Sequence, residues 1–396
     1  MKKDTKLVNA GRNFRKQAGS VNAPIHLTST VLYPTVEAYE QASRGNAFYD
    51  EQKGVVSSDF SYGISGTPTT FALQQALSEI EGEGENVIVG SGLAAITLTL
   101  YSFLKAGDHI LVTDSVYGPT RRFCNKELKK YGIETTYYDP AIGAGIKDLI
   151  KPNTRIIFME NPGSLTFEVQ DVPAIVKVAK SKGIITVIDN SWATSLYYKP
   201  FELGVDISIQ ALTKYIGGHS DVMLGVVSFK KEHKRDILAS YRNIGFTANP
   251  FDCYLVLRGL RTLSVRLKQH QESALKVAKW LEKHPKVSKV IFPALPSDDG
   301  YKIWKRDFSG AGGLFTFIFK KEYNEKTINK FVESIDLFGI GASWGGFESL
   351  ALPVNLSQVR TATKTFGKAN AVRLYIGLED ADDLIENLES ALKKLA

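Results

Sequence analysis

The chain has 396 residues, 43% of them hydrophobic, and a formal net charge of +7, which is the composition of a globular protein long enough for two or three domains. Its basic residues are spread along the sequence without a block of like charges, so we expect a solvated surface and no nucleic-acid partner. No apolar run reaches the length of a membrane span or a signal peptide, so we expect a cytoplasmic protein without membrane contact. Cys124 and Cys253 lack the spacing of metal ligands, so we expect no metal site.

The amino-terminal half predicts an arm followed by a large α/β domain. Residues 1–61 are polar and interrupted by Gly and Pro, which is typical of an extended arm that packs on a neighbouring subunit. Over residues 62–256, helical patterns alternate with short apolar runs, which predicts a mostly parallel sheet. The expected strands are residues 86–89, 109–113, 155–159, 184–188, 206–210 and 225–229. We expect the last of them to turn back along a sheet edge.

The carboxyl-terminal part, residues 257–396, predicts a smaller α+β domain. Long charged helices come first, and the apolar segment GGLFTFIFK then predicts a strand. The final helix carries an acidic first turn and a single apolar stripe formed by Leu384, Leu388, Leu392 and Leu395.

Lys214 is the first candidate for chemistry. It follows a predicted strand and precedes a Gly-rich turn in QALTKYIGGHSD. A lysine amine becomes nucleophilic at neutral pH when burial or a nearby cation lowers its pKa, and a Schiff base with an aldehyde cofactor is the best-known use of such an amine. Taken alone, a lysine in such a turn is more often an ordinary surface lysine.

Three further segments supply groups that pyridoxal 5′-phosphate (PLP) needs. Asp189 ends a buried strand in VIDNSW, where it matches a protonated pyridine nitrogen, although it also suits a helix cap. The Ser91-Gly92 turn opens a helix whose amino terminus favours phosphate, and the Thr213 hydroxyl is placed to join it, although such turns are common. Tyr117 offers a ring for stacking and a hydroxyl for proton transfer, although an isolated tyrosine is usually core.

Long ordered motifs extend these features over nearly the whole chain. They include YGISGTPTTFALQQAL, VGSGLAAI, DSVYGPTRRFC, MENPGS, RGLRTLSVRL, WKRDFSG, ASWGGFESL and VRLYIGLED. Together they resemble the Cys/Met-metabolism PLP-dependent enzymes of fold type I. The resemblance implies a large domain with a mostly parallel seven-stranded sheet, a smaller carboxyl-terminal α+β domain, and a homotetramer built from dimers that share active sites.

The resemblance also implies a role for each matching position. Lys214 would carry PLP, Asp189 would pair with its ring nitrogen, and Tyr117 would stack on the ring. Arg373 would bind the α-carboxylate of an amino-acid substrate, for which a planar guanidinium is suited. The phosphate would be held by Gly92, Leu93, Thr213 and Tyr62, and Tyr62 would come from the neighbouring subunit and also face the substrate.

Two positions separate this chain from its relatives. Ser343-Trp344 is similar to the β-lyase form, because γ-lyases and synthases of the family usually carry a leucine there. Alternatively, Trp344 is only a pocket wall. Ile64 stands where the family has an arginine for the phosphate, and Ala211 stands where many relatives have a serine. Loss of a charge-assisted contact at Ile64 predicts looser cofactor retention.

The resemblance implies β-elimination of L-cystathionine to homocysteine, pyruvate and ammonia in methionine biosynthesis. One alternative is a bifunctional enzyme that also racemises alanine, with Lys214 and Tyr117 as proton carriers on opposite faces of the substrate. Another is the γ-lyase or γ-synthase reaction, against which Trp344 argues. The non-enzymatic alternative is a PLP-binding scaffold, against which the complete set of catalytic residues argues.

Overall fold

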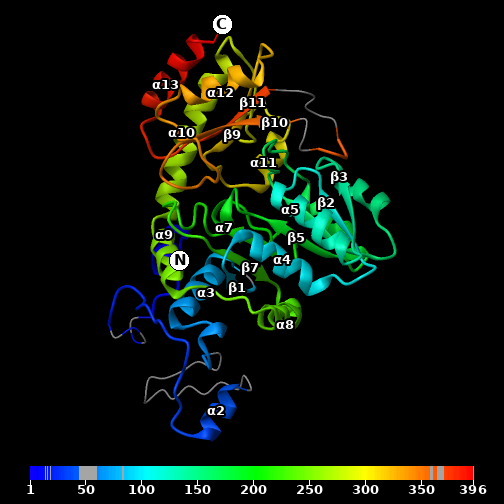
Figure 1. Ribbon diagram of the computed structural model, residues 1–396, viewed down its shortest axis with the longest axis vertical. Helices are drawn as coiled ribbons and strands as arrows, with labels where there is room; N and C mark the ends of the chain where they lie inside the picture. Colours follow the sequence, from blue (N-terminus) through cyan, green and yellow to red (C-terminus); the bar gives the residue numbers. More distant parts are fainter. Residues whose placement is uncertain are drawn as a thin grey trace.

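The computed structural model describes residues 1–13, 15, 17, 19–43, 60–82, 84–356, 360–363 and 370–395. Within these residues the chain forms a seven-stranded sheet and a four-stranded sheet (Figure 1). Part of the predicted arm, residues 44–59, lies outside the described residues. None of the described helices combines the length and the hydropathy that crossing a bilayer requires.

The larger sheet has the strand order β1-β7-β6-β5-β4-β2-β3. Neighbouring strands from β6 to β3 are parallel, whereas β7 is antiparallel to both β1 and β6. The prediction of a mostly parallel seven-stranded α/β sheet is therefore confirmed. The strands are β1 (Glu85–Val89), β2 (His109–Thr113), β3 (Glu134–Tyr138), β4 (Thr154–Glu160), β5 (Ile185–Asp189), β6 (Ile207–Ala211) and β7 (Gly225–Phe229).

Two details of the predicted sheet were wrong. The segment 225–229 does not run along an edge, because β7 pairs on both sides and every one of its residues is buried. The segment 134–138 was not expected to be a strand, yet it forms the edge strand β3 beside β2. Its side chains are mostly half-buried Thr and Tyr, so it lacks the apolar run that marks a central strand.

Helices cover both faces of the larger sheet because successive strand residues point to opposite sides. Val87 and Val89 pack in one apolar cluster with α4 and α8, whereas Ile88 packs in the other with α3, α6 and α9. The helices on the two faces are α3 (Pro68–Glu81), α4 (Gly92–Phe103), α5 (Gly118–Phe123), α6 (Val172–Ser181), α8 (Lys234–Ile244) and α9 (Pro250–Leu260). Short elements complete this part: η1 (Gly63–Ser65), η2 (Cys124–Leu128), η3 (Gly143–Leu149), α7 (Thr194–Tyr197) and η4 (Lys231–His233).

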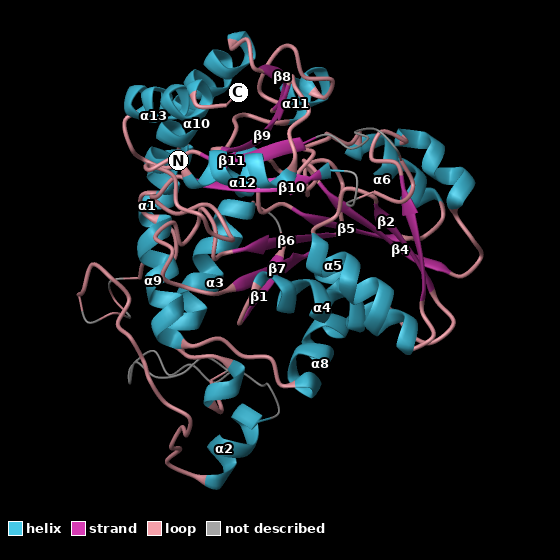
Figure 2. Cartoon of the chain, turned by 45° about the horizontal axis from the view of Figure 1, so that its top comes forward, coloured by secondary structure: helices cyan, strands magenta, loops and turns pink. Residues whose placement is uncertain are grey.

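The smaller sheet is antiparallel in the order β10-β11-β9-β8 and lies above the larger one in Figure 2. Its strands are β8 (Val287–Ile291), β9 (Leu314–Phe319), β10 (Leu350–Asn355) and β11 (Asn370–Tyr375). Its helices are α10 (Leu263–Lys283), α11 (Tyr301–Asp307), α12 (Glu325–Glu333) and α13 (Ala381–Lys393). The leucine stripe predicted for the last helix is buried, as expected. The proposed domain boundaries at residues 62 and 257 stay predictions.

The amino-terminal segment docks partly on its own chain, which the prediction of an extended arm did not include. Helix α1 (Lys3–Asn9) packs on α3 and α10 through the buried Leu7. The Arg261 guanidinium fixes it by donating to the carbonyls of Leu7 and Ala10. Helix α2 (Val36–Ser43) instead lies away from the body of the molecule in Figure 1.

Candidate active site

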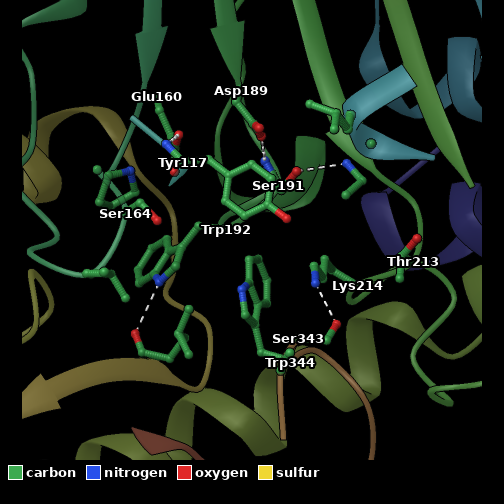
Figure 3. A pocket seen from close by; sticks show the side chains of 18 of the residues that line it. Tyr117, Glu160, Ser164, Asp189, Ser191, Trp192, Thr213, Lys214, Ser343 and Trp344 are labelled. Atoms are coloured by element: carbon green, nitrogen blue, oxygen red, sulfur yellow. Dashed lines mark hydrogen bonds between the residues drawn. The ribbon is translucent and has the colours of Figure 1, made fainter. Parts of the chain in front are cut away.

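A cavity of about 550 Å³ opens at the carboxyl ends of the strands of the larger sheet (Figure 3). This edge is where open α/β sheets bind ligands, because the loops that leave neighbouring strands diverge there. A second wall comes from the smaller-sheet side, where Ser343, Trp344, Leu352 and Arg373 line the cavity. The cavity therefore collects side chains from both sheets.

Lys214 lies in the turn after β6, and its amine points into this cavity. The amine donates a 2.5 Å hydrogen bond to the Ser343 hydroxyl and lies 5.1 Å from the centre of the Trp344 ring. Burial lowers the pKa of Lys214 to about 8, the positive charge of Arg373 acts in the same direction, and the Asp189 carboxylate opposes both. Such an amine is available as a nucleophile and as a base near neutral pH.

Two partly buried carboxyl groups lie at adjacent strand ends. Asp189 ends β5 and accepts a 2.9 Å hydrogen bond from the Ser191 backbone N–H. Glu160 ends β4 opposite Asp189 in the strand register and accepts a 2.6 Å hydrogen bond from the Tyr117 N–H. Burial raises the pKa of both carboxyl groups, and the neighbouring Asp189 charge further raises that of Glu160. A cationic ring nitrogen beside Asp189 would remove much of this cost.

Tyr117 is the N-cap residue of α5, and Figure 3 shows its ring projecting into the cavity. Burial raises the pKa of its hydroxyl, with further contributions from the negative charges of Asp189 and Glu160. The hydroxyl is therefore protonated at neutral pH and is able to donate a proton. Tyr117 thus presents both an aromatic face and an acid to a ligand in the cavity.

The amino terminus of α4 forms the part of the cavity suited to an anion. The Ser91 hydroxyl caps this helix by accepting from the Ala94 N–H, and Gly92 and Leu93 line the cavity beside it. A Cβ at Gly92 would lie 2.7 Å from the Cβ of Ala211, so glycine is required for the close approach of α4 to β6. Helix amino termini attract phosphate through their dipole and free N–H groups.

Thr213 also lines this end of the cavity. Its hydroxyl donates to the Leu224 carbonyl and accepts from the Leu224 N–H. Together with the reactive amine, the buried carboxylate and the aromatic face, this anion site provides the groups that PLP requires. The residues present fit this cofactor.

Arg373 completes the predicted site from β11. Its guanidinium donates a 3.2 Å hydrogen bond to the Ser343 carbonyl, and partial burial lowers its pKa. Ser343 has a φ of +81°, which is uncommon for a residue with a side chain. This backbone turns the Ser343 hydroxyl to Lys214 and its carbonyl to Arg373. Lys214 and Arg373 are the two cations among the described lining residues.

Tyr62 and Ile64 are the sequence-predicted residues that the chain does not bring to its own cavity. Tyr62 is 52% exposed and pairs with Thr30 in an isolated β-bridge, and Ile64 is 43% exposed in η1. Neither residue lines the cavity. Their expected contact with the active site of a neighbouring subunit stays a prediction.

Sequence reasoning assigned no role to several lining residues, among them Glu160, Ser164 and Trp192. Glu160 stands in MENPGS at the same strand-end position as Asp189, and that parallel was the available signal. Ser164 follows in the same loop. Trp192 forms part of the wall and donates from its indole to the Leu314 carbonyl, for which the sequence offers no signal.

Comparison with known proteins agrees with this geometry. The family described as Cys/Met metabolism PLP-dependent enzyme matches residues 4–393. The chain belongs to this family. It is consequently a PLP-dependent enzyme that acts on a small amino-acid substrate, as the sequence predicted.

Individual relatives cover nearly the full length of the chain. The L-alanine/L-glutamate racemase of Wolbachia pipientis wMel is 46% identical over 100% of this chain and 98% of its own. The cystathionine β-lyase of Escherichia coli K12 is 42% identical over 100% and 99%. The crystal structure of cystathionine γ-synthase from Xanthomonas oryzae pv. oryzae, in complex with aminoacrylate and cysteine, superposes with a TM-score of 0.88 at 30% identity, over 99% and 98%.

Proposed function

We propose that this enzyme cleaves L-cystathionine by β-elimination to homocysteine, pyruvate and ammonia, a step of methionine biosynthesis. The observation that carries the proposal is the Lys214 amine, held by the Ser343 hydroxyl and beside the Trp344 ring. Full-length similarity to relatives named cystathionine β-lyase supports it, including the 42% identity to the Escherichia coli protein.

Four polar side chains of the cavity have a task in this reaction: Lys214, Arg373, Tyr117 and Asp189. Bound PLP supplies an electron sink that stabilises negative charge at the substrate Cα. Arg373 binds the α-carboxylate and thereby orients the Cα–H bond. The neutral amine of Lys214 removes the α-proton, and the protonated hydroxyl of Tyr117 donates to the departing thiolate. Asp189 would pair as a carboxylate with the ring nitrogen of the cofactor, and the apolar walls limit the entry of water.

The products of L-cystathionine test this proposal. β-Cleavage yields homocysteine and pyruvate, whereas γ-cleavage yields cysteine and 2-oxobutyrate, so a thiol assay combined with a keto-acid assay separates the two reactions. The Lys214→Ala variant should lose turnover. Lys199→Met, which alters a half-buried lysine away from the cavity, should keep it. Release of 2-oxobutyrate as the main keto acid would contradict the β-lyase assignment.

Racemisation is the second candidate. The relative from Wolbachia pipientis wMel is named L-alanine/L-glutamate racemase, and it is 46% identical to this chain. Two proton carriers, the amine of Lys214 and the hydroxyl of Tyr117, line one cavity, which is the minimum that inversion at Cα needs. Formation of D-alanine from L-alanine tests this activity. An absence of D-alanine above the level of the Lys214→Ala variant would remove it.

We further propose a cytoplasmic homotetramer built from dimers that share active sites. Tyr62 and Ile64 are exposed and lie away from the cavity of their own chain, which supports a contact with the partner's cavity. Exposed apolar side chains of the amino-terminal arm, among them Leu32 and Val36, support burial in an assembly. Light scattering gives the subunit number. Mixing inactive Lys214→Ala and Tyr62→Ala chains should restore activity if sites are shared.

A further inference from the structure

A buried guanidinium packs against residues 212–218, which we call the Lys214 turn. Arg266 of α10 is 6% exposed and donates to the carbonyls of Tyr215 at 2.7 Å and Gly259 at 2.8 Å. It makes a longer contact of 3.4 Å with the carbonyl of Ile216, and its Nε donates to the Thr262 hydroxyl at 3.1 Å. Two of these acceptors belong to the two residues that follow Lys214 in the chain.

The partners of Arg266 are unusual for a buried cation. Within the described part of the chain, no carboxylate forms an ion pair with it, and burial lowers its pKa to about 10. A buried charge without a counter-charge is costly, and a well-packed apolar side chain often serves stability as well or better. The charge of Arg266 is therefore better explained by the backbone carbonyls that it binds than by a gain in stability.

The Lys214 turn is shaped around this guanidinium. Gly218 has a φ of +73°, and a Cβ there would lie 2.1 Å from an Arg266 nitrogen. The Gly218 N–H closes the turn by donating to the Lys214 carbonyl at 2.8 Å. A Cβ at Gly259 would likewise lie 2.2 Å from the Gly217 carbonyl oxygen, so α9 also abuts the turn. Small displacements of Arg266 consequently move the backbone that carries Lys214.

We propose that Arg266 is a positioning residue that holds the Lys214 turn so that the amine stays between the Ser343 hydroxyl and the Trp344 ring. The inference rests on the role proposed for Lys214. A slackened turn would let water reach the amine, raise its proton affinity and leave less neutral amine at pH 7. Lysine cannot replace arginine here, because one ammonium group cannot reach the planar set of acceptors.

The chain offers a matched control in Arg261, five residues earlier in the same motif. Arg261 is also partly buried and also donates to two carbonyls, but these belong to Leu7 and Ala10 of the amino-terminal segment. Arg261→Lys should therefore weaken packing without moving the Lys214 turn. Thr262→Val provides a milder lesion, because it removes the acceptor of the Arg266 Nε and the hydroxyl donor to the Gly259 carbonyl but keeps the guanidinium.

The unfolding temperature, kcat and KM are measured on the holoenzyme of each variant. The rate at which added PLP becomes linked to Lys214 is measured on the same chains after PLP has been removed. We expect Arg266→Lys to lower kcat on the order of 100-fold, the loss that a displacement of about 1 Å causes, with a smaller change in KM. Linkage should be slower, and its pH midpoint should rise. Thr262→Val should change these values in the same direction but less.

The comparison with Arg261→Lys separates positioning from stability. We expect Arg266→Lys and Arg261→Lys to lower the unfolding temperature equally. A change in the rate of PLP linkage, and in the pH midpoint of that linkage, in Arg266→Lys alone would then support the proposal. If Arg266→Lys does not fold, Thr262→Val alone must show the slower linkage. Unchanged linkage in the variants that fold would overturn the inference. Failure of the unaltered chain to link PLP through Lys214 would instead overturn the proposed function.

Discussion

The Lys214 amine should react with aldehydes near neutral pH much faster than an ordinary lysine. Burial, assisted by the Arg373 charge, lowers its pKa from 10.5 to about 8. An amine with a pKa of about 8 is about 9% neutral at pH 7, whereas an ordinary lysine is about 0.03% neutral, so Lys214 offers roughly 300-fold more reactive amine. Between pH 7 and pH 9 its neutral fraction rises about tenfold and then levels off.

The assay uses the chain stripped of PLP and pyridoxal without its phosphate, so that the reaction reports the amine and not the anion site. Linkage is followed by absorbance, and the signal of Lys214→Ala is subtracted to remove other lysines. The perturbation is Arg373→Met, which deletes a positive charge and should move the pH midpoint upward. A Lys214-dependent rate that still climbs above about pH 10, or a midpoint lowered by Arg373→Met, would refute the reasoning.

Three further predictions concern the expected phosphate contact, a buried carboxylate outside the cavity and the cavity wall. Ile64→Arg should bind PLP about tenfold more tightly by adding a charge-assisted contact, and equal or weaker affinity in a PLP titration would reject the looser retention inferred for Ile64. Asp114 is fully buried and accepts hydrogen bonds from Arg121 and from the backbone N–H groups of residues 361–363. Asp114→Asn should therefore lower the free energy of unfolding by about 3 kcal/mol in denaturant titrations. Burial raises the pKa of Asp114, but these hydrogen bonds outweigh burial and bring the pKa below 3.8. The contribution of Asp114 to the free energy of unfolding is therefore present above about pH 4 and is lost as the pH falls further. A destabilisation by Asp114→Asn that is equal at acid and neutral pH would contradict this. Trp344→Leu should raise the ratio of 2-oxobutyrate to pyruvate from L-cystathionine, and an unchanged ratio would make Trp344 a wall only.

Sequence patterns predicted those strands whose burial leaves a mark in their own residues. Central strands such as β4 and β5 are buried on both faces, so their apolar runs stand out from the flanking turns. The edge strand β3 escaped because one side of it meets solvent and its Thr and Tyr side chains resemble those of a loop. The position of β7 also escaped, because strand order depends on contacts between segments far apart in sequence.

The candidate site divides in the same way. Asp189 and Lys214 were recognisable because a strand end and a Gly-rich turn leave marks in neighbouring residues. Glu160 carried the same mark but was overlooked. Arg266 carried none, because its partners are backbone carbonyls, which every residue possesses and which only the fold brings to one guanidinium.

Ser343 joins the two halves of the cavity. Its hydroxyl accepts a hydrogen bond from the Lys214 amine, and its carbonyl accepts one from Arg373. A single residue from the smaller-sheet side therefore connects the proposed base, Lys214, with the proposed carboxylate-binding residue, Arg373. A guanidinium has five N–H donors, which leaves a planar pair for a substrate carboxylate while the contact with Ser343 persists. Substrate binding at Arg373 thus need not release the Lys214 amine, whereas Arg266 donates to the carbonyl of Tyr215, the residue that follows Lys214. Ser343 binds the amine, and Arg266 binds the backbone that follows it, so the lowered pKa of Lys214 depends on contacts that only the assembled fold provides.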